Sequence, residues 1–308
     1  MKVVEFGTAQ FEIVDVEDVT IKLKDIAVLI ARSAEFLVDL KGQDRISSRI
    51  DATGQPGSIR LSGTTGSIDA SLQDVVRMKR VDQTFMQRLD GTVSAGYSYT
   101  SGSGIGRFSF LEAAVYATEN NEVFQQYSTV FTYGDDADGA DRVEAGLGEL
   151  HAFRGRYLVG QYVQYQTIAS TGIDWRWVSI SAGGVRVLHR RHVDLNALSG
   201  VTLTKERVTT GESSDLEVEW PLMLMWKLAG PAPKILVTGR AVLSKSLSVS
   251  DRYRLDARLA VDYEIYKHSS YGTLTLGTQV LYNRDSKPIT AAQKQKDLNV
   301  SFNIGYTF

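Results

Sequence analysis

The chain has 308 residues, of which 43% are hydrophobic, with 34 Lys and Arg against 36 Asp and Glu. This composition excludes a disordered chain, and a net charge of -2 without a basic run leaves no electrostatic footprint for nucleic acid. The absence of cysteine excludes a disulfide framework, a thiolate nucleophile and a Cys-ligated zinc site.

If the chain crosses a membrane, it must do so with β-strands rather than with helices. A spanning helix needs about 20 consecutive apolar residues, and the best run here, Ile26–Ile30 between Asp25 and Arg32, comes nowhere near that. Residues 1–6 lack the apolar centre of a signal peptide, so we expect the signal to be absent from this chain.

Residues 1–85 are predicted to form a small β-sandwich or β-barrel module with two internal repeats. Val19–Ile26 and Ile68–Val75 each carry alternate apolar residues that run into a Leu-x-Asp-Ile/Val motif. A short alternating strand precedes each of them, at Phe11–Ile13 and Ile59–Leu61. Two copies are too few for an open solenoid, so the pattern favours a compact module.

Residues 86–308 are predicted to form an antiparallel transmembrane β-barrel, which makes the fold class all-β. The segments are about ten residues or longer, the length that a tilted strand needs to cross a bilayer, and short Gly, Asp, Asn and Ser turns separate them. We expect about 12 strands, at Leu89–Ser101, Ile105–Thr118, Glu122–Gly134, Asp141–Phe153, Tyr157–Ile168, Ile173–Leu188, Val193–Arg207, Asp215–Leu228, Lys234–Ser246, Arg252–His268, Tyr271–Asn283 and Gln295–Phe308.

The last strand, from Leu298 to Phe308, shows the barrel pattern most clearly, because apolar and polar residues alternate along its whole length. Its aromatic residues Tyr306 and Phe308 are predicted to be the signal that the barrel-assembly machinery reads. The strand Val218–Leu228 repeats the alternation, with aromatic residues near both ends as an interfacial girdle requires. A soluble β-sandwich also alternates, but its strands usually have only five or six residues.

Charged residues on strands eight to ten are predicted to line the barrel lumen, because Arg or Lys on the lipid face costs roughly 2–4 kcal/mol at the midplane. This lumen set is Glu217, Glu219, Lys227, Arg240, Arg254, Asp256, Arg258, Asp262 and Glu264. It could line a pore that sorts small solutes, or it could be a network of ion pairs that fills a narrow barrel, and both interpretations stay open. Four residues in strands two to five fit neither face cleanly, which indicates either a bulge or an error of one strand in the count over residues 105–168: Glu112, Gln125, Glu149 and Gln161.

Two stretches resemble a known family. The duplicated β-module followed by Phe85–Thr100, and Ile173–Trp177 leading into Ser181–Val185, are similar to the salt-induced outer membrane protein (YdiY-like) family. The resemblance runs from about Phe36 to the end of the chain. It implies an outer-membrane β-barrel and supplies no catalytic residues.

No catalytic motif appears, so we expect no enzyme and no cofactor or metal. The four histidines, His151, His189, His192 and His268, fall near predicted periplasmic strand ends, away from the outer leaflet where a lipase or protease would act. His189 and His192 could be a metal pair, although a solvated turn explains them as well. A carboxylate pair inside the lumen remains the route to a lipid-modifying or hydrolytic enzyme.

The predicted location is the bacterial outer membrane, with the N-terminal module in the periplasm. The expected partners are outer-membrane lipid, lipopolysaccharide, the barrel-assembly machinery and a periplasmic protein that binds residues 1–85. The leading hypothesis is a passive channel for small solutes or a structural envelope barrel with an interaction module. The alternatives are the lipid-modifying or hydrolytic enzyme and a membrane-anchored scaffold.

Overall fold

The structure is a computed structural model that describes residues 3–5, 8–13, 16–41, 45–63, 66–80, 88–100, 105–134, 139–154, 156–190, 192–230, 235–268, 272–289 and 295–307. In these ranges the chain is built from β-strands and two short 3-10 turns, which confirms the all-β prediction. No helix in the described part of the chain is long and apolar enough to cross a membrane.

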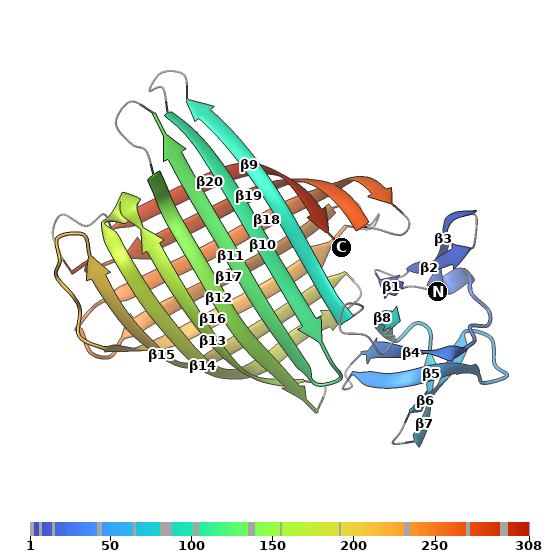
Figure 1. Ribbon diagram of the computed structural model, residues 1–308. Coiled ribbons are helices and arrows are strands. Elements are labelled where there is room, and N and C mark those ends of the chain that lie inside the picture. The colour runs from blue at the N-terminus through green and yellow to red at the C-terminus, as the bar shows by residue number, and fades with distance from the viewer. Residues whose placement is uncertain are drawn as a thin grey trace.

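The N-terminal module is one open antiparallel sheet (Figure 1). Its strands lie in the order β3-β2-β1-β8-β4-β5-β6-β7. They are β1 (Val3–Glu5), β2 (Thr8–Ile13), β3 (Val16–Lys22), β4 (Ala31–Leu40), β5 (Ile46–Ala52), β6 (Ser58–Gly63), β7 (Gly66–Ser71) and β8 (Val75–Arg80).

The strand order of the module reads the same from either edge when β1–β4 are matched with β5–β8. The fourth strand of each unit crosses to the other unit, because β8 pairs with β1 and β4 pairs with β5. Hairpins β2–β3 and β6–β7 each lead into a turn that begins with a leucine, Leu23 or Leu72, and each leucine is only 2% exposed. The repeated motif therefore places one buried leucine in each half of a shared core.

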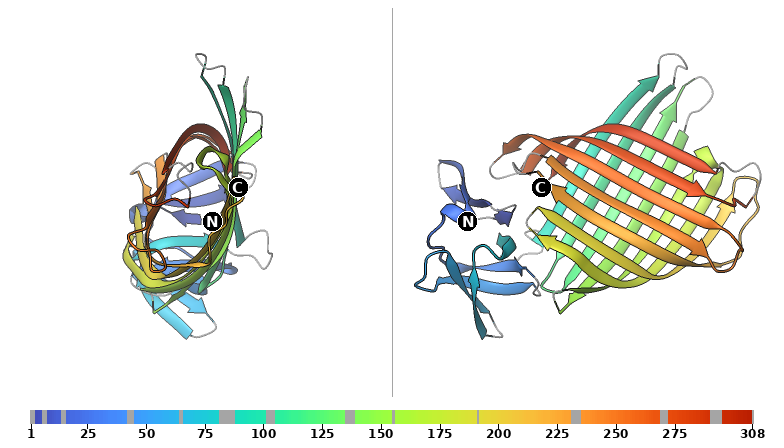
Figure 2. Two further views of the ribbon diagram at one scale, coloured as in Figure 1. Left: turned by 90° about the vertical axis from the view of Figure 1, so that its left-hand side faces the viewer. Right: turned by 180° about the vertical axis from the view of Figure 1, so that it is seen from behind.

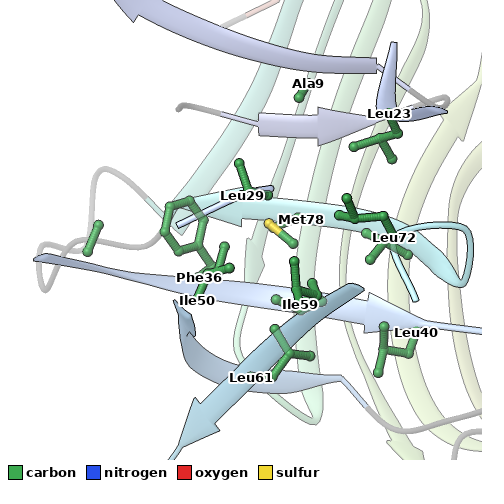
Figure 3. Packing of buried hydrophobic residues seen from close by; sticks show 13 residues of the cluster. Ala9, Leu23, Leu29, Phe36, Leu40, Ile50, Ile59, Leu61, Leu72 and Met78 are labelled. Carbon is green, nitrogen blue, oxygen red and sulfur yellow. The ribbon is translucent and has the colours of Figure 1, made fainter. Parts of the chain in front are cut away.

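That core is apolar and lies on one face of the sheet (Figure 3). Phe36 and Leu40 of β4 pack with Ile50, Ile59 and residues of the other strands, and each of these four side chains is at most 2% exposed. Removal of this apolar surface from water is the main stabilising contribution to the module.

The second part of the chain is a closed antiparallel barrel of twelve strands in chain order, in which β20 pairs with β9 to complete the ring. The strands are β9 (Leu89–Thr100), β10 (Ile105–Ala117), β11 (Asn121–Tyr133), β12 (Gly139–Phe153), β13 (Tyr157–Ile168), β14 (Ile173–Arg190), β15 (Val193–Val208), β16 (Glu217–Ala229), β17 (Ile235–Ser246), β18 (Tyr253–His268), β19 (Gly272–Asp285) and β20 (Lys296–Thr307).

All twelve predicted barrel strands are confirmed, and their ends differ from the prediction by at most two residues. The register shifts between β11 and β12 at Val130 and Phe131, which is a bulge within the region where one was predicted. That bulge lies away from the four residues that fitted neither face. Those residues are on the exterior: Gln125, Glu149 and Gln161 are exposed and Glu112 is half-buried.

The outer surface of the barrel is largely apolar. Along β16, Trp220, Leu222 and Leu224 are 40–50% exposed, whereas Glu219 and Met223, on the alternate positions, are buried. Most of the exposed aromatic side chains lie in two belts, one toward each end of the barrel. The belt near the module contains Phe153, Tyr157, Tyr263, Tyr266 and Tyr306, and the far belt contains Tyr97, Phe108, Phe131, Tyr133, Trp177, Trp220 and Tyr253. An apolar band between aromatic belts is the exterior of an outer-membrane β-barrel.

The barrel is oval in cross-section, and the module lies at the end that holds the short turns 118–120 and 154–156 (Figures 1 and 2). We refer to this end as the module end and to the opposite one as the far end. An oval section brings opposite walls close together, and side chains meet across the lumen. A shorter contact lies along one wall: Ser109 of β10 and Asn303 of β20 meet over Gly96 of β9, the strand between them, and the Asn303 oxygen accepts a hydrogen bond from Ser109 at 3.1 Å.

Candidate functional site: the barrel lumen and the docked module

Glu206 of β15 is the centre of an ion-pair network in the far half of the lumen. Its side chain is fully buried, and its carboxylate accepts hydrogen bonds from Arg176 at 2.6 Å, Arg252 at 2.8 Å and Arg254 at 3.0 Å. The far network consists of Arg176, Glu206, Glu217, Glu219, Arg252, Arg254 and Asp285. Each arginine is therefore held by at least one buried carboxylate.

A second network joins opposite walls of the barrel. Arg142 of β12 donates to Asp297 of β20 at 2.9 Å, and Arg258 of β18 donates to the buried carboxylate of Glu144 on β12. The middle network consists of Arg142, Glu144, Arg240, Asp256, Arg258 and Asp297. Because these contacts tie β12 to β18 and β20, they close the lumen as well as stabilise it.

An apolar layer occupies the lumen nearer the module end. It contains Leu158, Tyr162, Ile180, Ala182, Leu198, Met223 and Val242, all of them buried. The two kinds of interior meet at Tyr162, where the guanidinium of Arg240 lies 5.3 Å from the ring centroid, within range of a cation–π interaction.

A cavity of about 90 Å³ remains between the two networks in the far half of the lumen. Its lining includes Gln164, Thr202, Ser244 and Asn283, together with arginines and carboxylates of both networks. The cavity therefore belongs to the same site as the two networks.

The predicted lumen set is divided between the networks and the module half of the barrel. Glu217, Glu219 and Arg254 belong to the far network, and Arg240, Asp256 and Arg258 belong to the middle network. Lys227, Asp262 and Glu264 lie further toward the module end, on β16 and β18.

The two residues predicted to be an assembly signal are placed differently. Tyr306 is on the barrel exterior and is 39% exposed, so its ring belongs to the aromatic belt near the module. Phe308 lies outside the described residues.

Both network centres, Glu144 and Glu206, were missed from the sequence. Each had a signal in the alternation of its own strand: Glu144 lies between Val143 and Ala145, and Glu206 is in phase with buried Thr204. The partners of these glutamates come from distant strands, so the pairs could be found only once the barrel was closed.

Arg45 fastens the module to the barrel. Its guanidinium lies 2.5 Å from the Asp39 carboxylate within the module and 2.8 Å from the Glu122 carboxylate at the start of β11. It also donates to the carbonyl oxygen of Thr118 in the turn before β11, at 3.2 Å. A second contact joins Lys79 of the module to Asp90 of β9, at 2.5 Å.

Acid should loosen this docking contact. Burial raises the pKa of the Asp39 carboxyl, but Arg45, through its charge and hydrogen bonds, and the charges of Arg77 and His189 outweigh burial and hold the pKa below its ordinary value. The ion pair therefore stabilises the folded state fully above about pH 4 and is lost as the pH falls through the lowered pKa. We expect protease resistance of the module to fall in that range, measured by limited digestion of the purified chain.

Asp39→Asn is the matched control, since it removes the titrating group and keeps the size of the side chain. Its digestion rate should be higher than that of the wild type at pH 7 and should change less between pH 5 and pH 2. An acid transition of equal size in both proteins would contradict the role assigned to Asp39.

The four histidines lie at the module end of the barrel, and none lies near either network. His151 Nδ1 is 2.6 Å from Asn121 Oδ1, and His189 Nδ1 is 3.4 Å from a carboxylate oxygen of Asp194. His192 is in the turn after β14, and His268 ends β18. Within the described ranges, no group of three or more His, Cys, Asp or Glu side chains could hold a metal ion.

Comparison with solved structures gives several likenesses, three of which follow. The translocator domain of the autotransporter NalP from Neisseria meningitidis is 17% identical, covers 71% of this chain and 88% of its own, and has a TM-score of 0.41. The beta domain of the Bordetella autotransporter BrkA is 11% identical, with coverages of 71% and 98% and a TM-score of 0.34. A bacterial polysaccharide outer membrane secretin is 11% identical, with coverages of 91% and 99% and a TM-score of 0.31.

A search of curated proteins found no significant match. A family model described as "Protein of unknown function, DUF481" matches residues 92–308, which extend from within β9 to the last residue of the chain. The matched region includes both lumen networks and excludes the N-terminal module. The chain belongs to the DUF481 family.

Proposed function

We propose that this protein is a structural barrel of the bacterial outer membrane that carries a periplasmic interaction module. The observation that carries the proposal is the filled lumen, in which two ion-pair networks and an apolar layer occupy the space that a solute would need. A barrel of twelve strands is intermediate in width between small filled barrels and wide open porins. Its interior side chains therefore decide whether the lumen is filled or open. The resemblance to the salt-induced outer membrane protein (YdiY-like) family supports the same location.

The orientation of the barrel follows from its turns. Periplasmic turns of outer-membrane barrels are short and extracellular loops are longer. The turns after β10 and β12 span residues 118–120 and 154–156, whereas the connections after β15 and β19 span residues 209–216 and 286–295. We therefore assign the module end to the periplasm, where the module can meet a periplasmic protein and the barrel-assembly machinery. The far end then meets lipopolysaccharide.

The proposal includes neither solute transport nor catalysis. Arginines hold the buried carboxylates of both networks, so Glu144 and Glu206 are not free to act as acid and base. The histidines lie at the opposite end from the outer leaflet, where a lipid-modifying enzyme would bind its substrate. The exposed apolar residues Val28 and Ile30 of the module, 56% and 51% exposed, offer contact area for a protein partner.

Planar-bilayer recording of the folded, full-length chain tests the filled lumen. We expect no steady conductance from the wild type at moderate voltage, with heat-modifiable migration on gels as the check that the barrel is folded. Steady open-channel conductance from the folded wild type would overturn the proposal and restore the passive channel.

A further inference from the structure

A polar stripe crosses the outside of the barrel on β10–β14, part of the wall that faces the viewer in Figure 1. Gln125 donates a hydrogen bond to Glu112 at 2.5 Å. Glu149 of β12 lies directly opposite Gln161 of β13, and Gln161 lies opposite Ser181 of β14. Between β11 and β12 the step is diagonal, because Leu147 lies opposite Gln125 and Glu149 is two residues further along β12. These five residues, one on each of five neighbouring strands, form the polar stripe.

The stripe lies at the depth where lipid should be most apolar. On β13, Gln161 is midway between Tyr157 of the belt near the module and Tyr165, each four residues away. Tyr165 lies directly opposite Trp177 of the far belt. Four residues of a tilted strand rise about 10 Å along the barrel axis. Gln161 and its neighbours are thus about 10 Å from either edge of the apolar band.

The opposite wall has no such stripe among its described residues. At equivalent depths β18–β20 expose apolar side chains, including Leu259, Leu276 and Phe302. Polar groups in the hydrocarbon region are costly unless they are paired, and they normally face a protein neighbour or a water-filled space. One wall of this barrel is therefore built for lipid, and the other is built for a polar partner.

We propose that this stripe is the contact surface between two copies of the chain in the membrane. It carries carboxylate acceptors and amide donors side by side, so it is complementary to itself. A twofold axis along the membrane normal between β12 and β13 places Glu149 of one copy against Gln161 of the other, as an isologous interface requires. The inference rests on the proposed placement of the barrel in a bilayer.

Single-cysteine cross-linking in membranes tests the contact, and the chain has no cysteine of its own to interfere. Val163→Cys and Leu147→Cys lie beside the stripe on exposed exterior positions, and Leu276→Cys on β19 is the matched control on the opposite wall. We expect a covalent dimer at the two stripe positions and none at position 276.

A double variant separates loss of the contact from loss of the fold. Glu149→Leu with Gln161→Leu makes the stripe apolar, so the barrel should still insert and keep its heat-modifiable migration, while the dimer is lost at Val163→Cys. Dimer of equal yield at positions 163 and 276, or no dimer at either stripe position in inserted barrels, would overturn the inference and leave lipid or another protein on the stripe. Failure to insert at all would instead contradict the proposed membrane function.

Discussion

Replacing Glu206 by Gln is expected to destabilise the barrel by about 3–5 kcal/mol. Arg176, Arg252 and Arg254 converge on this one buried carboxylate, which is inaccessible to solvent. The amide of Gln keeps the shape but removes the charge, and it directs a donor group at guanidinium donors. Three buried cations then share the remaining carboxylates of the far network.

Chemical unfolding of the barrel in lipid vesicles, followed by tryptophan fluorescence, measures this loss. Glu212→Gln is the matched control, because Glu212 is exposed in the connection between β15 and β16 and should change stability by less than about 0.5 kcal/mol. Equal unfolding midpoints for the two variants would show that the far network does not stabilise the barrel.

Phe36→Ala should unfold the module and leave the barrel folded. Phe36 is 1% exposed at the centre of the module core, and truncation of a buried Phe costs about 3–5 kcal/mol. Small domains have a total stability of similar size, so the module should become sensitive to protease. The barrel has its own ring of hydrogen-bonded strands and keeps its structure.

Digestion with trypsin reports whether the module is folded, and heat-modifiable migration on gels reports whether the barrel is folded. Ile68→Ala is the matched control, because Ile68 lies on edge strand β7 and is 44% exposed. Loss of the barrel together with the module would mean that the two fold as one unit.

The barrel strands could be predicted because each strand has lipid on one side and protein on the other. Along Glu217–Leu228 apolar residues for the lipid side alternate with residues for the interior. In the structure the same two sets of residues lie on the exterior and in the interior of that strand. The interior pairs could not be predicted in the same way. Whether Arg258 meets Glu144 depends on how far the barrel is flattened, and no local pattern encodes that.

The arrangement of the module was also hidden from sequence reasoning. The repeated motif indicates two similar units, but the exchange of β4 and β8 between them is a tertiary feature. At Glu149 and Gln161 the simple alternation failed because the exterior is polar there. The interruption of the apolar–polar alternation therefore identifies the wall whose exterior is polar.

Spin labelling of β16 in lipid bilayers shows directly whether these strands cross a membrane with the assigned face toward lipid. Single cysteines at Leu222, Met223, Leu224 and Met225 report four consecutive positions on an otherwise cysteine-free chain. We expect high accessibility to oxygen at 222 and 224 and low accessibility at 223 and 225. Uniform accessibility, the opposite phase, or quenching at 222 and 224 by a water-soluble reagent would contradict it.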